Sequence, residues 1–124
     1  MIIVLQSSLY QSAVAQIVVG DQAALEDAID NAAAGSEIII SNGTWDDVRI
    51  SIDVDATEEQ PVIIRAETTG SVFFEGNSQV SIGGSYIIFK GVVFRNPSGL
   101  IVNNDRIDPI IEFRANGEEC DNCT

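Results

Sequence analysis

The sequence predicts a right-handed parallel β-helix, of which this chain forms the first coils, with a helix that caps the N-terminal end. Three observations support this fold. Short runs rich in Ile and Val recur every 24 residues, at positions 38–40, 62–64, 86–88 and 110–112. Clusters of Gly, Asn, Ser and Thr separate the runs, as corners between the faces of a coil would. One helical pattern precedes all of the runs.

The helical pattern extends from Asp21 to Ala34. Asp21 is a favourable N-cap residue. Four apolar side chains follow at helical spacing: Leu25, Ala28, Ile29 and Ala32. Gly35 comes directly after this pattern and is predicted to be the C′ residue of the helix. Because the apolar stripe is narrow and rich in Ala, the helix needs a larger surface to pack on, and the open end of the solenoid provides one.

Equivalent positions of the repeats are predicted to stack in columns along the solenoid, which suits stiff β-branched side chains. One column consists of Ile throughout: Ile39, Ile63, Ile87 and Ile111. Two further echoes pair residues 48–50 with 72–74 and residues 80–82 with 100–102. An antiparallel sandwich is the alternative, since it also contains short strands and frequent turns. The regular spacing of the columns favours the solenoid.

The composition fits one domain with a hydrophobic core. Of the 124 residues, 45% are hydrophobic and 20% are charged. The 19 acidic and 6 basic residues give a net charge of -13, which argues against binding to nucleic acid or to anionic membranes. No stretch of about 18 apolar residues is present to span a membrane. Since the chain has no His, a general base would have to be Lys, Tyr, Asp, Glu or Arg.

Residues 1–15 carry no charged side chain and differ from residues 16–124, which are assigned to the β-helix. The apolar run Met1–Leu5 and the small residues Ala13 and Ala15 resemble the end of a secretory signal peptide, although a basic n-region is missing. An ordinary first strand is the alternative. The signal-peptide interpretation predicts a secreted or periplasmic protein.

Several motifs in order carry a resemblance to a known family. Residues 28–40 and the following Asn42-Gly43-Thr44-Trp45 resemble the start of many pectate-lyase-like β-helices. More specific are the segments PVIIRAETTG at 61–70, FEGNS at 74–78, IGGSYII at 82–88 and GVVFRN at 91–96. Together with residues 111–114 and 120–123, these segments resemble polysaccharide lyase family six, which holds alginate lyases and chondroitinase-B-type enzymes. The motifs belong to the scaffold and do not select the substrate.

The resemblance implies a polysaccharide lyase that acts on an acidic polysaccharide, either alginate or dermatan and chondroitin, by β-elimination. A base removes the C5 proton of a uronate, and the 4-linked sugar leaves. The resemblance also implies calcium held by oxygen ligands, a lysine base and an arginine partner. In the family these groups lie on coils further along the solenoid. No catalytic residue and no metal ligand is therefore assigned in this chain, which alone is expected to be inactive.

Three residues are nevertheless candidates for catalysis or substrate binding. Lys90, the only lysine, could serve as the base, and the alternative is a solvated lysine on a turn. Arg114 could bind a uronate carboxylate from a strand stacked over Ile87, or it could be an ordinary surface arginine. Glu112 interrupts the apolar column, either because the register slips there or because the strand turns its carboxylate toward a substrate groove.

Other polar and aromatic residues have two readings each. The densest acidic cluster consists of Asp53, Asp55, Glu58 and Glu59. It lacks the pattern of an EF-hand calcium loop, which favours a solvated loop. Trp45 and Tyr86 either stack on sugar rings or pack on the solenoid.

Cys120 and Cys123 form a single C-x-x-C without a second ligand pair, so no zinc site is predicted. Packing as two small side chains and a direct disulfide both remain open. For the whole protein, a non-catalytic carbohydrate-binding or structural β-helix is the alternative to a lyase, since both would share these coils.

Overall fold

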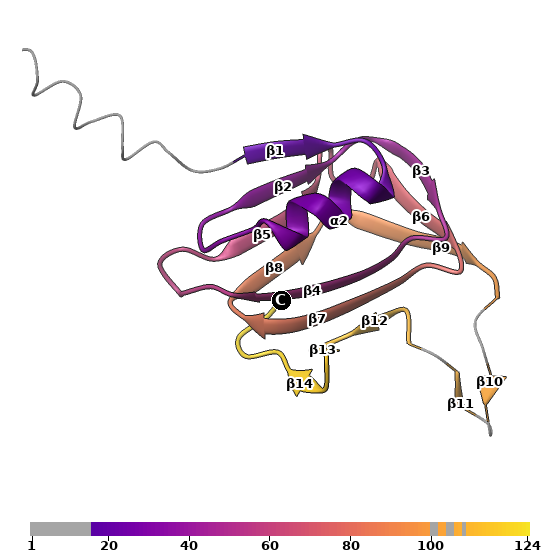
Figure 1. Ribbon diagram of the computed structural model, residues 1–124. Coiled ribbons are helices and arrows are strands. Elements are labelled where there is room, and N and C mark those ends of the chain that lie inside the picture. The colour runs from indigo at the N-terminus through magenta and orange to yellow at the C-terminus, as the bar shows by residue number, and fades with distance from the viewer. Residues whose placement is uncertain (1–15, 100–101, 104–105, 108) are drawn as a thin grey trace, which may run out of the picture.

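A computed structural model describes residues 16–99, 102–103, 106–107 and 109–124 (Figure 1). Three parallel β-sheets form the walls of a short solenoid, and successive strands of one sheet come from successive coils. The architecture is therefore the parallel β-helix that the sequence predicts. The segment that resembles a signal peptide, 1–15, lies outside the described residues.

The elements are as follows. Sheet A consists of β1 (Gln16–Val19), β2 (Glu37–Ile40), β5 (Val62–Ala66) and β8 (Ile87–Lys90). Sheet B consists of β3 (Gly43–Asp46), β6 (Val72–Gly76) and β9 (Val92–Pro97). Sheet C consists of β4 (Arg49–Asp55), β7 (Gln79–Ser85) and β12 (Ile111–Glu112). Two short hairpins are formed by β10 (Val102–Asn103) with β11 (Arg106–Ile107), and by β13 (Arg114–Ala115) with β14 (Glu118–Glu119). The only described helix is α2 (Gln22–Asp30).

The helix α2 begins as predicted and ends earlier than predicted. The side chain of Asp21 accepts a hydrogen bond from the backbone N–H of Ala24 at 2.8 Å, which confirms the N-cap. The helix ends at Asp30 instead of Ala34, because the Asn31 side chain donates to the carbonyl of Asp27 at 2.8 Å and so caps the last turn. Gly35 lies four residues after the C-cap Asn31, so the prediction that Gly35 is the C′ residue of the helix is wrong.

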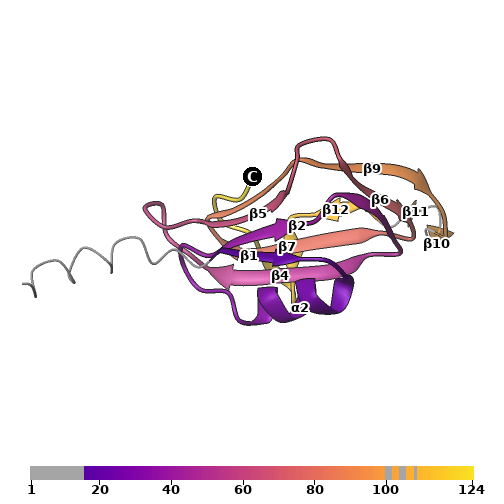
Figure 2. The same ribbon diagram turned by 90° about the horizontal axis from the view of Figure 1, so that it is seen from above.

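The predicted capping role of the helix is confirmed, although β1 comes before it in the chain. Leu25, Ala28 and Ile29 are buried against the solenoid, and α2 lies beside β4 at the N-terminal end (Figures 1 and 2). The Gln22 side chain accepts from the backbone N–H of Arg49 at 3.3 Å and donates to its carbonyl at 3.5 Å. The helix therefore covers the edge of sheet C that would otherwise lack a neighbouring strand.

The predicted isoleucine column is wrong in its register. In sheet A, Ile39 aligns with Arg65, Ile63 with Ile88, and Ile87 with Val62. Ile111 lies in sheet C, where it aligns with Val80. The buried Ile38 aligns with the buried Ile64 and then with the half-buried Phe89. A second aligned pair of buried side chains is Ile40 and Ala66. A constant period of 24 fails because the corner loops differ in length, so that strands of the three sheets recur at different intervals.

The two weaker sequence repeats are also wrong in their register. Residues 48–50 and 72–74 lie in different sheets, since Ile50 aligns with Val80 and Val72 aligns with Gly43. Residues 80–82 do not repeat at 100–102, because Val80 aligns with Ile111 in the next coil. Residues 100–101 lie outside the described part of the chain.

An aromatic column fills the core next to sheet B. Trp45, Phe74 and Phe94 align in three successive coils. The ring centroids of Trp45 and Phe74 are 6.1 Å apart, and those of Phe74 and Phe94 are 5.5 Å apart in an edge-to-face arrangement. Trp45 is 8% exposed, and its indole N–H donates to the Ser41 carbonyl at 3.0 Å. Trp45 is therefore a core residue and not a stacking platform for sugars.

The chain from Arg114 onward folds back over the outer face of sheet C. β13 and β14 form a two-residue hairpin whose turn residues, Asn116 and Gly117, have φ values of 53° and 85°, as a type I′ turn requires. Ala115 of this hairpin is buried against Gly83 of β7. No helix within the described ranges is long and apolar enough to cross a membrane.

The last residues of the chain return to sheet A. The backbone N–H of Phe89 donates to the Thr124 carbonyl at 2.7 Å, and the N–H of Tyr86 donates to the Asp121 carbonyl at 2.9 Å. The N–H of Thr124 in turn donates to the Ile87 carbonyl at 2.8 Å. Residues 121–124 thus lie beside β8 as the next strand of sheet A would.

Truncation of the central ring in the aromatic column tests the packing. We expect Phe74→Ala to lower the free energy of unfolding by about 3–5 kcal/mol, because Phe74 is 1% exposed and its neighbours cannot refill the space. Phe73→Ala is the matched control. Phe73 points out of the same strand, where it is half-buried under Arg95, so its truncation should cost about 1–2 kcal/mol. Urea denaturation measures both variants, and equal losses would contradict the orientation of β6.

A second test concerns the seat of the hairpin on β7. A Cβ atom at Gly83 would stand 2.8 Å from the Cβ of Ala115, so Gly83→Ala should cost about 1–3 kcal/mol of stability. Adding Ala115→Gly should restore more than half of that loss, because it removes the clashing atom.

The neighbouring glycine provides the control for this double-mutant cycle. Gly84 has a φ of +77°, and a Cβ there would meet the backbone of Val54, so Ala115→Gly should not rescue Gly84→Ala. Urea denaturation of the variants gives the coupling. Additive losses at Gly83 and Ala115 would show that the hairpin does not rest on β7.

Candidate functional site

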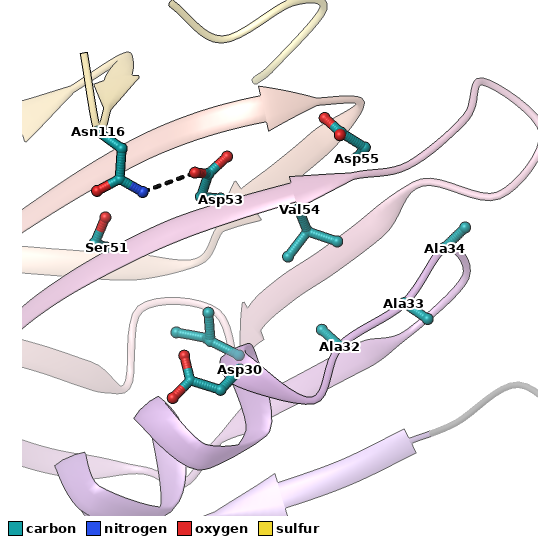
Figure 3. Close-up of a pocket in the computed structure, with 10 residues that line it drawn as sticks. Asp30, Ala32, Ala33, Ala34, Ser51, Asp53, Val54, Asp55 and Asn116 are labelled. Atoms are coloured by element: carbon teal, nitrogen blue, oxygen red, sulfur yellow. Dashed lines mark hydrogen bonds between the residues drawn. The ribbon is translucent and has the colours of Figure 1, made fainter. Parts of the chain in front are cut away.

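A groove lies on the outer face of sheet C. Its volume is about 630 Å³. Strand β4 forms the floor, the end of α2 and the following loop form one wall, and the tip of the β13–β14 hairpin forms the other (Figure 3). Ten residues line it: Ile29, Asp30, Ala32, Ala33, Ala34, Ser51, Asp53, Val54, Asp55 and Asn116.

The groove is acidic because alternate residues of β4 point outward. Ile50 and Ile52 are buried in the core, whereas Ser51, Asp53 and Asp55 are exposed on the opposite side of the strand. Asp53 accepts a hydrogen bond from the Asn116 side-chain amide at 2.7 Å, which joins the floor to the hairpin wall. The groove therefore offers hydrogen-bond acceptors and negative charge.

Asn116 was not among the residues that the sequence analysis singled out. Its role follows from the turn, because a left-handed Asn followed by Gly closes the hairpin and places the Asn side chain over sheet C. The Asn-Gly pair between two short runs was the available signal for this hairpin. The contact with Asp53, 63 residues earlier in the chain, had no signal in the local pattern.

The acidic cluster of the sequence analysis is divided by the structure. Asp53 and Asp55 lie on β4, whereas Glu58 and Glu59 lie in the loop that follows it. Within the part of the chain that the structure describes, no three acidic or cysteine side chains come close enough to hold a metal ion together. These residues do not fit the calcium site that the family resemblance implies.

Lys90 lies far from the groove, at the end of β8 on the outer face of sheet A. It is exposed and aligns with Arg65 of β5. Arg65 forms an ion pair with Glu37 of β2, with 2.6 Å between Nε and Oε1. Lys90 is thus one member of a short charged cluster on this face, and no described carboxylate or hydroxyl is aligned with it as a catalytic partner.

Arg114 and Glu112 lie near each other at the C-terminal end of the solenoid. Arg114 begins the hairpin and pairs with Glu119 at 2.9 Å between Nη2 and Oε1. The expectation that its strand stacks over Ile87 is wrong, since β12 pairs with β7. Glu112 aligns with Ser81, which aligns with Ser51, in a polar outward column of sheet C. Glu112 therefore belongs to a polar column of sheet C. Its predicted place in an apolar column resulted from the wrong register.

Four of the five arginines have described side-chain contacts within the scaffold. Arg65 and Arg114 pair with glutamates, as above, and Arg49 donates to the side chains of Asn77 at 2.7 Å and Gln79 at 2.8 Å. Arg95 pairs with Glu75 and lies over the Phe73 ring, 3.6 Å from its centroid. Three of these guanidinium groups join neighbouring coils, and the fourth, that of Arg114, joins the two strands of the hairpin.

Two of these pairs change the acidity of their carboxyl groups. Hydrogen bonds from Gln16 and Arg65 lower the pKa of Glu37 below its ordinary value of 4.5. The hydrogen bond from Arg95 lowers the pKa of Glu75 in the same direction, assisted by Asn96. Both carboxylates are therefore held in the charged form by contacts between coils.

Comparison with known proteins places these coils in a family. The family model described as chondroitinase B matches residues 19–124. The structure of the PL6 family alginate lyase AlyGC superposes with a TM-score of 0.76 at 27% sequence identity, over 88% of this chain and 14% of that chain. No curated protein sequence matches this chain.

Two further solved structures share the fold of these coils. The PL6 family polysaccharide lyase Pedsa3628 from Pseudopedobacter saltans has a TM-score of 0.63 and 31% identity, over 65% of this chain and 19% of that chain. A mannuronic acid specific family 6 lyase from human gut microbiota shares the fold, with a TM-score of 0.74 and 18% identity, over 87% of this chain and 24% of that chain. This chain thus spans a small part of each relative's length. Since the family model extends over most of its residues, the chain belongs to the chondroitinase B family.

Proposed function

We propose that this chain forms the N-terminal coils of a secreted or periplasmic polysaccharide lyase that cleaves a uronate polymer, alginate foremost, by β-elimination. The observation that carries the proposal is the similarity to an alginate lyase, at 27% identity over 88% of this chain. The chondroitinase B family model supports the wider class of acidic polysaccharides as substrates.

The geometry supports a scaffolding role for these coils. The contacts of Arg49, Arg65 and Arg95 hold neighbouring coils together, and Lys90 lies on a different face from the groove. β-Elimination needs a base at C5 and a cation that neutralises the uronate carboxylate, because the C5 proton is only weakly acidic beside a carboxylate anion. We propose that coils following Thr124 supply the lysine base, the arginine and the calcium ligands.

The proposed location outside the cytoplasm has one structural support. Cys120 and Cys123 are joined in a disulfide, a bond that persists in oxidising compartments.

A chimera with a complete lyase tests the proposal. Residues 19–124 replace the aligned N-terminal coils of AlyGC, and alginate cleavage is followed by the ultraviolet absorbance of the unsaturated uronate product. We expect the chimera to cleave alginate and the 124-residue chain alone to release no product, with or without Ca²⁺. Product from the chain alone would contradict the proposed division of roles.

The variant Lys90→Ala in the chimera tests whether Lys90 belongs to the scaffold or takes part in catalysis. Because Lys90 lies outside the groove and aligns with Arg65, we expect the rate to change less than about twofold. Loss of activity in a variant with an unchanged circular dichroism spectrum would make Lys90 a catalytic residue. A folded chimera without any lyase activity would favour the alternative, a non-catalytic β-helix.

The ion pair between Glu37 and Arg65 predicts a pH dependence of stability. Because the pKa of Glu37 is lower in the folded chain than its ordinary value of 4.5, the pair stabilises the fold above pH 4.5. This contribution is lost as the pH falls from 4.5 through the folded-state pKa. Glu37→Gln should therefore be less stable than the parent at pH 7, and the difference should shrink below pH 4.5.

Urea denaturation across this pH range measures the effect. Glu58→Gln, in the exposed loop after β4, is the matched control and should follow the parent chain at every pH. An equal response of the two variants would show that the ion pair contributes nothing to the stability of sheet A.

A further inference from the structure

The Cys120–Cys123 disulfide stands at the junction between the hairpin and sheet A. β14 ends at Glu119, and residues 121–124 lie beside β8. The Cα atoms of the two cysteines are 5.9 Å apart, and only two residues separate them in sequence. The bond therefore closes the corner through which the chain passes from the outer face of sheet C to the edge of sheet A.

The backbone contacts beyond this corner are few. On the β8 side, Tyr86 donates to Asp121 and Phe89 donates to Thr124, and Thr124 donates back to Ile87. Asp121 also donates to the Gly84 carbonyl at 2.9 Å. The side chains of Asp121, Asn122 and Thr124 are exposed, and the half-buried Cys123 is the one residue of this segment that packs against the hydrophobic core. The disulfide ties this apolar contact to the end of the hairpin, because it joins Cys123 to Cys120.

When the disulfide is reduced, each sulfur atom has a backbone carbonyl oxygen nearby that can accept a hydrogen bond from the thiol. The Sγ of Cys120 lies 3.1 Å from the Gly83 carbonyl oxygen, and the Sγ of Cys123 lies 3.7 Å from the Asp121 carbonyl oxygen. Each distance lets a thiol donate a hydrogen bond. Both cysteines are half-buried, so each is open to solvent on one side.

The charge around the corner selects the kind of reductant. Glu118, Glu119 and Asp121 surround the two cysteines in the sequence, and all three are exposed. Arg114 pairs with Glu119, so the negative charge of the corner comes mainly from Glu118 and Asp121. This negative potential disfavours the approach of an anionic thiol such as glutathione. A neutral dithiol attacks as a thiolate with a single negative charge and therefore meets a smaller barrier than the more highly charged thiolate of glutathione.

We propose that Cys120 and Cys123 form a reversible thiol–disulfide switch that controls the docking of residues 121–124 on β8. In the exchange, a thiolate of a neutral dithiol attacks one sulfur, and the S–S bond of the chain breaks. The second thiol of the reductant then closes its own disulfide. The chain gains two electrons and two protons, and the dithiol loses the same number. This inference is independent of the lyase activity, because it concerns only residues of this chain.

Amide hydrogen exchange on the 124-residue chain, followed by NMR, tests the switch. Reduction with excess dithiothreitol should accelerate exchange at Phe89 and Thr124 by roughly tenfold, because opening the loop restores chain entropy to the corner. Ile64, in the buried interior of β5, should change less than about twofold. Removal of the reductant in air should restore the slow exchange.

Cys120→Ser/Cys123→Ser is the matched variant. It should show the fast exchange of the reduced chain at Phe89 and Thr124, and dithiothreitol should not alter it. At low salt, glutathione should reduce the parent chain more slowly than dithiothreitol does at equal thiolate concentration. Added salt should narrow that difference, since it screens the carboxylates.

Several results would overturn the proposal. A thiol titration that finds two free cysteines in chain purified in air would show that the bond does not form. Unchanged exchange at Phe89 and Thr124 after reduction would show that the bond does not control docking. Equal acceleration at Ile64, or an oxidised chain without slow exchange at any of these amides, would show that no local docking equilibrium exists.

Discussion

Each strand of a parallel β-helix depends on the coils before and after it for its backbone hydrogen bonds. This constraint explains why α2 covers the edge of sheet C at the N-terminal end and why residues 121–124 lie where the next strand of sheet A would. At the N-terminal end, the Gln22 side chain contacts both backbone groups of Arg49, and α2 buries its apolar face there. At the other end, the hairpin covers sheet C and residues 121–124 lie along β8.

The same constraint separates the inner and outer faces of each coil. Side chains that point inward must match the coil above and below, so they form apolar columns such as Trp45, Phe74 and Phe94. Outward side chains meet water and can pair across coils at lower cost. That is where the pairs Arg65–Glu37 and Arg95–Glu75 lie. The coils are thus joined by packing on the inside and by charge on the outside.

The fold class was accessible from the sequence because short apolar runs, turn residues and an N-cap at Asp21 all agree with a solenoid. The register was not accessible, because a β-helix keeps its columns while its corners vary in length. In sheet A, Ile38 aligns with Ile64, and in sheet B, Gly43 aligns with Val72. The number of residues between the two aligned positions differs between these sheets. The 24-residue period of the isoleucines therefore assigned Ile111 to sheet A, although Ile111 lies in sheet C.

The candidate groove was less predictable for a related reason. Asp53 was visible as part of an acidic cluster, but its neighbours in space are Asn116 and the end of α2, which lie far away in sequence. Gly83 leaves room for Ala115, and this absent side chain lets the hairpin come close enough for the Asp53 contact. The residues around a glycine in the sequence do not indicate which distant residue packs against it.

The charge of the scaffold limits where a uronate polymer could lie on it. The groove over β4 presents Asp30, Asp53 and Asp55, and a polymer with one carboxylate per sugar is repelled by such a surface. The cationic cluster of Arg65 and Lys90 lies on another wall of the solenoid, and Glu37 partly neutralises it. For a lyase built on these coils, productive binding therefore requires positive charge from a bound cation or from basic side chains beyond the described coils. The net charge of -13 makes that requirement stronger, because every uronate that approaches the N-terminal coils meets their long-range field before it meets any single side chain.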